Sequence, residues 1–482
     1  DFKCVPACCV SRWRTRRRGC NSGAATTAPG ASCTAPLRER SSKMLPETGK
    51  PVDPCRQKGV LAPVFSLLET IAAAKTVLVA SVTEVESSIR LLESVEDLRS
   101  GTPSAELCAL FGCVLGVQAL YCNQWDRERD CGREFVRAKP YLEKALDGAQ
   151  AICFDELVRR FCIAARVFSG LLLEAMQLAA ESVRLYKSAG FYRLEGETCC
   201  KLAGVLQEDE ARVAIFKQAC SAFQVADEME PGSKLTYISW TYALTMLNET
   251  TTCSRVAESA IRHCPGFWTH PLQRPSFVVP GLDARPWHSC APFPWIQRLE
   301  ENWERIREEL FGAGFGSGRD DEWQVVSGHD QTLTHGTGTW REYPILGLGS
   351  ETEAAAKVQC PFTYALLSEV DAIRQHADLR PTETALFSRL TPGTHLKAHC
   401  GPTNTCLTCH LGLVIPEGCE IRVGSEKRSW TEGKCMVFDD SFEHEVWHHG
   451  DALRIVLLIR FWHPDIPPGR RAAIVQDEGR SK

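Results

Sequence analysis

The chain has 482 residues, of which 24% are charged and 44% are hydrophobic, and its formal net charge is −5. This length predicts two or three domains, and the hydrophobic content excludes a fibrous or wholly disordered chain. The acidic balance argues against a dedicated nucleic-acid-binding protein, so we expect no nucleic-acid partner.

Residues 1–58 are predicted to form a disordered basic arm. The first 50 residues contain ten Lys or Arg and three Asp or Glu, which gives this stretch a net charge of +7. A solvated tail is the favoured interpretation and a transit peptide is the alternative. The 24 cysteines are scattered along the chain and leave the redox compartment open.

Residues 59–263 are predicted to be a helical, repeat-like region. Within 142–152 the apolar residues recur mainly at three- and four-residue steps, the period of one helix face. Related segments recur roughly every 35–45 residues, a spacing typical of stacked helical hairpins of tetratricopeptide (TPR) type. An irregular helical bundle is the alternative, and either architecture offers a surface for a protein partner.

The uncharged stretch 107–125 is the strongest membrane candidate in the sequence. Its strongly apolar part would span about 24 Å as a helix, which is short of a hydrocarbon core of about 30 Å. We therefore expect a buried helix here and no membrane segment.

Residues 264–294 are predicted to be a proline-rich linker. Seven prolines fall in this stretch, and proline interrupts both helices and strand pairing. All thirteen histidines lie at or after His263, so chemistry that depends on imidazole must lie in the C-terminal half.

Residues 295–468 are predicted to be a β-rich domain, followed by a tail at 469–482. The domain opens with one amphipathic helix at about 295–311, and short alternating or β-rich runs separated by turn residues follow. A series of short strands separated by turns is typical of a jelly roll. With the helical region before it, the expected fold class is α+β multidomain. The predicted strand runs include 384–390, 406–415, 419–424, 434–438 and 453–461.

Two histidines and one arginine carry the expected chemistry of this domain. His399 and His444 are far enough apart in sequence to converge from opposite sheets of a jelly roll, and two imidazoles in a β-cavity suit a first-row transition metal. Arg454 lies within an apolar run, where a guanidinium needs an anion and fits a carboxylate. Together they predict a site for a keto acid that chelates iron. In the alternative, the histidines are core residues and Arg454 pairs with Asp439, Asp440 or Glu443.

Four short segments carry a family resemblance. They are 399–404 (HCGPTN), 410–413 (HLGL), 438–446 (FDDSFEHEV) and 462–464 (WHP). Together they resemble the catalytic core of the aspartyl/asparaginyl β-hydroxylase family, whose members are Fe(II)- and 2-oxoglutarate-dependent oxygenases with a double-stranded β-helix fold. A looser similarity extends upstream through 279–282 and 286–287, and several family members carry helical repeats before this domain.

The resemblance implies the hydroxylation of a protein or peptide side chain, with dioxygen, Fe(II) and 2-oxoglutarate. His399 and His444 match the iron ligands. Arg454, assisted by Ser388, matches the residue that binds the distal carboxylate of 2-oxoglutarate, and His410 matches the residue near the other carboxylate.

Gly401 stands where most of the wider superfamily has an acidic third ligand, so the resemblance implies a water in that place. It allows the endoplasmic reticulum lumen as the compartment, with the cytoplasm as the alternative.

Three positions depart from the family pattern and leave the substrate open. Cys406 and Thr408 stand where the family usually has arginines that hold an acidic substrate side chain. Arg460 stands where an acidic residue is common, which indicates either an altered substrate or a solvent-facing arginine. Two further functions therefore stay open: an inactive oxygenase fold that acts as a binding module through its helical region, and a small-molecule hydroxylase.

Two other groups of metal-binding residue types have simpler interpretations. Cys406 and Cys409 lie on one predicted strand. Side chains along a strand alternate between its two faces, so these two residues are expected on opposite faces, which disfavours a shared zinc ion. His448 and His449 precede a predicted turn, where surface histidines are expected.

Overall fold

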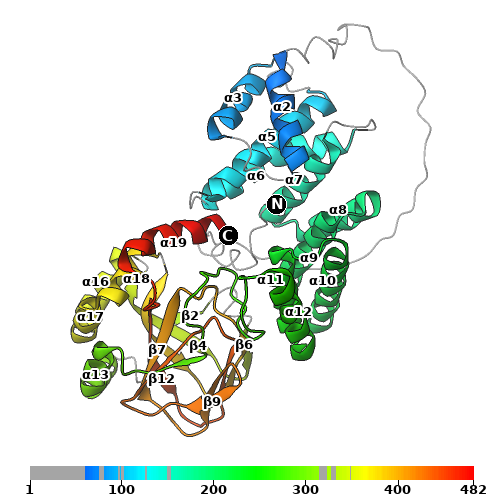
Figure 1. Cartoon of the computed structure of the whole chain (residues 1–482). Helices are drawn as coiled ribbons and strands as arrows, with labels where there is room; N and C mark the ends of the chain where they lie inside the picture. Colours follow the sequence, from blue (N-terminus) through cyan, green and yellow to red (C-terminus); the bar gives the residue numbers. More distant parts are fainter. Residues whose placement is uncertain are drawn as a thin grey trace, which may run out of the picture.

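The computed structural model describes residues 60–74, 81–95, 98, 103–124, 128–148, 154–313, 323–326, 333–347, 349–380 and 382–481. The predicted basic arm, 1–58, lies outside these ranges. In the described part a helical region is followed by an antiparallel β region, which confirms the predicted α+β multidomain class (Figure 1).

Successive helices build the N-terminal region, and from α5 to α12 each helix packs against the next along the chain. Local signals define individual ends: Ser81 and Glu84 form a capping box at the start of α3. The TPR pattern itself stays a prediction. The helices are α2 (Ala62–Ala74), α3 (Val82–Glu93), α5 (Ala105–Gln124), α6 (Glu128–Leu146), α7 (Asp155–Phe168), α8 (Leu172–Tyr186), α9 (Ala189–Ala203), α10 (Asp209–Met229), α11 (Lys234–Met246) and α12 (Thr250–His263).

Helix α5 contains most of the stretch that is the strongest membrane candidate. Its apolar residues belong to the core of the helical region, and Gly116 packs so closely that a Cβ there would lie 2.5 Å from the Phe161 ring. Within the described ranges no helix is both long and apolar enough to cross a bilayer. The prediction of a buried helix is therefore confirmed.

Two antiparallel sheets form the C-terminal domain in the described residues. The larger has the strand order β1-β10-β7-β12-β5-β4-β2 and the smaller β3-β6-β11-β8-β9. Strands β5 to β12 divide between the sheets as in a jelly roll. The strands are β1 (Trp287–His288), β2 (Gln324–Val325), β3 (Thr334–Gly336), β4 (Trp340–Gly347), β5 (Glu383–Leu390), β6 (Thr394–His399), β7 (Cys406–Val414), β8 (Cys419–Val423), β9 (Glu426–Ser429), β10 (Cys435–Phe438), β11 (His444–His448) and β12 (Arg454–Trp462).

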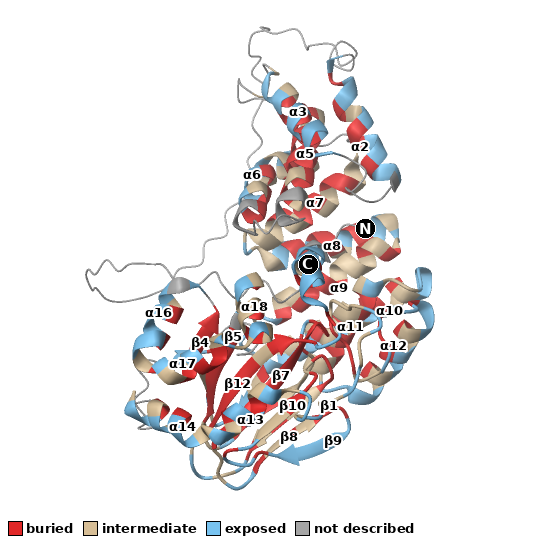
Figure 2. Cartoon of the chain, turned by 60° about the vertical axis from the view of Figure 1, so that its left-hand side comes forward, coloured by how far each residue is buried: buried red, intermediate tan, exposed pale blue. Residues whose placement is uncertain are grey.

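Helices cover the outer face of the larger sheet, so its central strands β7 and β12 are buried on both sides (Figure 2). Because both faces of β12 are buried, its sequence is a nearly continuous run of apolar residues. The covering helices are α13 (Pro294–Glu301), α14 (Trp303–Gly312), α16 (Ser350–Gln359), α17 (Pro361–Ser368) and α18 (Asp371–Leu379).

The single helix predicted at about 295–311 is in fact two, α13 and α14. The chain leaves helical geometry at Asn302, whose φ of −112° and ψ of 10° break the run. The Asn302 side chain donates a hydrogen bond to the Arg298 carbonyl, and this local bond competes with helix continuation.

The proline-rich segment lies against the jelly roll. Gln273 forms an isolated bridge with Phe442, Phe277 forms one with Thr403, and β1 extends the larger sheet beside β10. Residues 469–482, expected as a tail, belong largely to helix α19 (Pro468–Ser481), which contacts α18 and also α5 of the helical region.

Candidate active site

The predicted site residues face the space between the two sheets. On β12, Arg454 lies on the same face as Val456, which belongs to the core between the sheets. Ser388 of β5 pairs with Val456, and His410 of β7 pairs with Leu458, so both share that face. The structure therefore brings Ser388, His410 and Arg454 to one surface of the larger sheet.

The two predicted metal ligands lie on adjacent strands of the smaller sheet, and not on opposite sheets as expected. His399 of β6 pairs directly with His444 of β11, and their ring centroids are 4.1 Å apart. The next registered pair is Leu396 with Val446. Between these two pairs β6 has two residues, Lys397 and Ala398, where β11 has one, Glu445, which is a β-bulge. Strict alternation from the inward-facing Leu396 would turn His399 outward, and the bulge turns it inward.

Backbone carbonyls fix the orientation of both imidazole rings. His399 Nδ1 donates to the Lys397 carbonyl at 2.7 Å, and His444 Nδ1 donates to the Phe442 carbonyl at 3.0 Å. A carbonyl can only accept, so in each neutral ring the lone pair lies on Nε2. Burial lowers the pKa of His444 to about 4. Neutral imidazoles held through Nδ1 have the arrangement that metal-binding histidines commonly show.

Arg454 is a buried cation without a carboxylate partner among the described residues. Its exposed fraction is 2%, and its Nε has no hydrogen-bond partner. The guanidinium carbon lies 4.2 Å from the Trp430 ring centroid, and burial lowers the pKa of Arg454 to about 10. A desolvated guanidinium in this state is a strong site for an anion.

The acidic residues that the sequence suggested as partners of Arg454 form other contacts. Asp439 accepts hydrogen bonds from Gln273, and Glu443 pairs with Arg274 and Arg422. The alternative of a structural ion pair at Arg454 therefore lacks a partner in the described residues.

His410 presents a second buried donor. Trp430 Nε1 donates to His410 Nδ1 at 3.2 Å, so the proton of the neutral ring lies on Nε2. That Nε2 is buried without a hydrogen-bond partner, and burial together with the Arg454 charge lowers the pKa of His410 well below its usual value. Trp430 thus contacts both His410 and Arg454, a role that no sequence pattern indicated.

Ser388 is buried and can donate its hydroxyl proton. Trp340 Nε1 donates to Ser388 Oγ at 3.1 Å, which uses the oxygen as an acceptor. The hydroxyl hydrogen stays available for an anion on the face that Ser388 shares with Arg454.

The structure gives a steric reason for Gly401. A Cβ at this position would lie 2.7 Å from Oδ1 of Asp440, and the Gly401 amide donates to the Asp440 carbonyl at 2.6 Å. The Asp440 carboxylate therefore fills the place that a side chain at 401 would need. Its Oδ1 is buried without a hydrogen-bond partner, and burial raises its pKa. The sequence by itself indicates Asp440 only as a partner for Arg454.

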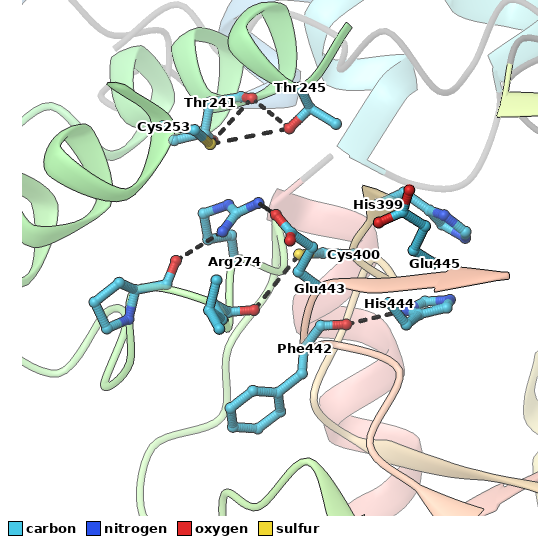
Figure 3. A network of polar contacts seen from close by, with 12 residues as sticks. Thr241, Thr245, Cys253, Arg274, His399, Cys400, Phe442, Glu443, His444 and Glu445 are labelled. Atoms are coloured by element: carbon cyan, nitrogen blue, oxygen red, sulfur yellow. Dashed lines mark hydrogen bonds and ion pairs between the residues drawn. The ribbon is translucent and has the colours of Figure 1, made fainter. Parts of the chain in front are cut away.

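The proline-rich segment fixes the loop before His444 (Figure 3). Gln273 Nε2 donates to Asp439 Oδ2 at 3.2 Å and to Ser441 Oγ at 3.0 Å. Arg274 donates to Glu443 at 2.6 Å, and both side chains are buried. We call Gln273 and Arg274 the loop clamp. The two residues come from a segment about 170 positions away in sequence, so no local pattern could have revealed them.

Two minor expectations have different outcomes. His448 is buried rather than at the surface, and its Nε2 donates to the Ala452 carbonyl at 2.7 Å. His449 is exposed, as expected.

The two cysteines of β7 lie on opposite faces of the larger sheet. Cys409 belongs to the core on its outer face, whereas Cys406 lies on the inner face by strand alternation. Among the described residues no group of three or more His, Cys, Asp or Glu is arranged to hold a metal ion.

Comparisons with known proteins match the C-terminal part of the chain. Residues 300–464 match the family described as Aspartyl/Asparaginyl beta-hydroxylase. The mouse Aspartyl/asparaginyl beta-hydroxylase is 36% identical over 219 residues, which cover 44% of this chain and 28% of that protein. The chain therefore spans less than a third of the length of this relative.

Two further relatives show the breadth of the similarity. The Ornithine lipid ester-linked acyl 2-hydroxylase of Rhizobium tropici is 36% identical over 38% of this chain and 63% of its own length. Aspartate beta-hydroxylase domain-containing protein 2 of mouse is 34% identical over 42% of this chain and 58% of its own length.

Among solved structures, a thermophilic TPR protein of Thermus thermophilus aligns with 54% of this chain and 94% of its own. Its TM-score of 0.26 and identity of 15% are too low to support an argument about the helical region. The family resemblance of the C-terminal part is confirmed by the sequence matches. Residues 300–464 are therefore similar to the aspartyl/asparaginyl β-hydroxylase family.

Proposed function

We propose that this protein is an Fe(II)- and 2-oxoglutarate-dependent dioxygenase that hydroxylates a side chain of a protein or peptide. The observation that carries the proposal is the pair of buried donors, Arg454 and His410 Nε2, on the sheet face opposite the His399–His444 pair. Unpartnered buried donors of this kind are costly unless a ligand satisfies them.

The donor set fits the proposed groups. His399 and His444 would hold Fe(II) through Nε2, and two nitrogen ligands with open positions are typical of oxygenase iron sites. Arg454 and Ser388 would bind the distal carboxylate of 2-oxoglutarate, and His410 would donate to the other one. When bound, iron and the keto acid activate dioxygen for hydroxylation, and the protein orients the reactants.

Each side chain has a task that follows from its contacts. The backbone carbonyls of Lys397 and Phe442 hold the imidazoles in one tautomer. Trp430 holds the proton of His410 on Nε2, where it can face a carboxylate. Asp440 keeps an acceptor oxygen beside Gly401, where it can bind a water in place of a third protein ligand.

The test is the turnover of 2-oxoglutarate to succinate with Fe(II) and a peptide library that includes Asp and Asn. We expect peptide-stimulated succinate formation, its loss in His399→Ala and in His444→Ala, and its retention in the exposed control His449→Ala. Mn(II) binding measured by calorimetry should fall in the same two variants. Full turnover by His444→Ala would contradict the ligand assignment, and no succinate with any peptide would favour the binding-module alternative.

A further inference from the structure

Three cysteines gather on the outer face of the larger sheet, away from the candidate active site. Cys435 of β10 pairs with Leu411, which lies two positions from Cys409 on β7. Both cysteines therefore face the core between this sheet and its covering helices. Cys290, just after β1, donates a hydrogen bond from its Sγ to the Cys435 carbonyl at 3.5 Å. All three have free thiols in this structure.

The strand register makes Cys290 the better partner for Cys435. Strands β1 and β10 pair antiparallel, and the last registered pair is His288 with Val437. Extending this register by two residues sets Cys290 opposite Cys435. Directly opposed residues have Cα atoms about 4.5–5.5 Å apart, and a disulfide needs about 4.4–6.8 Å. The two cysteines thus lie where a disulfide can join them without rearrangement of the strands.

Cys409 is a poorer partner for the same sulfur. It lies diagonal to Cys435 across β7 and β10, and diagonal residues have Cα atoms about 7–8 Å apart, which exceeds the range of a disulfide. Cys409 is also buried, whereas Cys290 and Cys435 are partly exposed. A small oxidant therefore reaches Cys290 and Cys435 more easily.

We propose that Cys290 and Cys435 are an oxidation site, at which a small-molecule disulfide such as glutathione disulfide closes a bond between the two sulfurs. The Cys290 thiolate first attacks the oxidant and releases one glutathione. The Cys435 thiolate then attacks the Cys290 sulfur and releases the second glutathione. The two protein thiols lose two electrons and two protons in total, and glutathione disulfide is reduced to two molecules of glutathione.

The surroundings of Cys290 make the first of these steps slow. Burial, together with the nearby Cys435 and Glu300, raises the pKa of Cys290 to about 11, so little thiolate is present at neutral pH. Once the mixed disulfide has formed, Cys435 is already beside it, so the second step is intramolecular. The site therefore responds to a sustained oxidising environment and not to a brief exposure.

The bond would join two segments that hold the candidate active site. Cys290 belongs to the proline-rich segment, which also carries the loop clamp, and Cys435 begins β10, which leads into the loop before His444. The two cysteines are 145 positions apart, so the bond restricts the unfolded chain strongly. We expect the Tm of the oxidised protein to be about 5–10 °C higher. The inference is independent of the proposed function, because it involves neither cosubstrate nor substrate.

The test is peptide mapping of the full chain after incubation in glutathione buffers that range from reduced to oxidised. In the oxidised buffer, mass spectrometry of unreduced digests should show a pair of peptides linked through Cys290 and Cys435, and the Tm should rise. Both results should be lost in Cys290→Ser and in Cys435→Ser. They should be kept in Cys409→Ser and in the matched control Cys220→Ser, a partly exposed cysteine of the helical region.

The map of the wild-type protein decides the outcome even where a variant fails to fold. No linked pair in the most oxidising buffer, or glutathione left on Cys290 without closure, would overturn the inference. A link between Cys435 and Cys409 would overturn it as well, because the register argument would then be wrong. An equal Tm for the reduced and the linked protein would refute the predicted gain in stability.

Discussion

At the scale of single residues, we expect Arg454 to lower the stability of the ligand-free protein because its buried charge is kept for an anionic ligand. A guanidinium without a carboxylate partner costs free energy when it is buried, and replacing it by an apolar side chain of similar length removes that cost. We expect Arg454→Met to raise the free energy of unfolding of the ligand-free protein by about 1–3 kcal/mol. Wild type should gain thermal stability from 2-oxoglutarate with Mn(II), and the variant should gain none. A variant that is less stable than wild type without ligand would indicate a structural role for Arg454.

Trp430 should act through the proton of His410. Trp430→Phe keeps an aromatic ring beside Arg454 but removes the indole N–H that bonds Nδ1. The loss of one such bond predicts a three- to tenfold rise in the KM for 2-oxoglutarate, about 0.5–1.5 kcal/mol, with a smaller change in the KM for the peptide. Trp447→Phe, on the outer face of the smaller sheet, is the control, and an equal effect of both variants would refute the assignment.

Asp439 gives the folded protein a defined pH dependence. Burial raises its pKa to about 7, against an ordinary value of 3.8. Between these values the folded state binds a proton that the unfolded state has released, so the free energy of unfolding contributed by Asp439 falls as the pH rises from about 4 to about 7. The slope cannot exceed about 1.4 kcal/mol per pH unit for one group.

Urea unfolding at several pH values should show this fall in wild type and a flatter profile in Asp439→Asn. Parallel profiles for the two proteins would show that Asp439 is ionised in the folded state.

At the scale of elements, the loop clamp makes the proline-rich segment part of the site. Arg274→Met would leave Glu443 buried without one of its two arginines, and breaking a buried pair typically costs about 3–5 kcal/mol. Since Glu443 precedes His444, we also expect weaker Mn(II) binding. The exposed Arg285→Met, in the same segment, should change neither quantity.

Combining Arg274→Met with Glu443→Gln sharpens this prediction. The double variant should lose less stability than the sum of the two single ones, because it removes both members of the pair. Additive losses would mean that the two side chains do not interact in solution.

At the scale of the whole molecule, separate cores should unfold separately. The helical region and the jelly roll bury distinct clusters of apolar residues, and α19 and the proline-rich segment join them. Calorimetry should therefore resolve two transitions, and Mn(II) with 2-oxoglutarate should shift only that of the jelly roll. His444→Ala should abolish the shift, and a single transition that shifts as a whole would contradict the division.

Local patterns in the sequence predicted much of this protein. Periodicity indicated the helical region, because one face of each helix must be apolar to be buried. Alternating runs located β5, β7, β8, β10 and β12 to within about two residues, since strand burial leaves a local signature. The motifs around His399, His444 and Arg454 indicated the family resemblance and the candidate site residues.

Only the tertiary structure decided how those residues meet. The bulge in β6 that turns His399 inward depends on register with β11, which alternation alone predicts incorrectly. The contacts of Trp430 and of the loop clamp with the site join residues that are far apart in the chain. Such contacts leave no local period, because strand pairing and loop packing are set by the global fold and not by neighbouring residues.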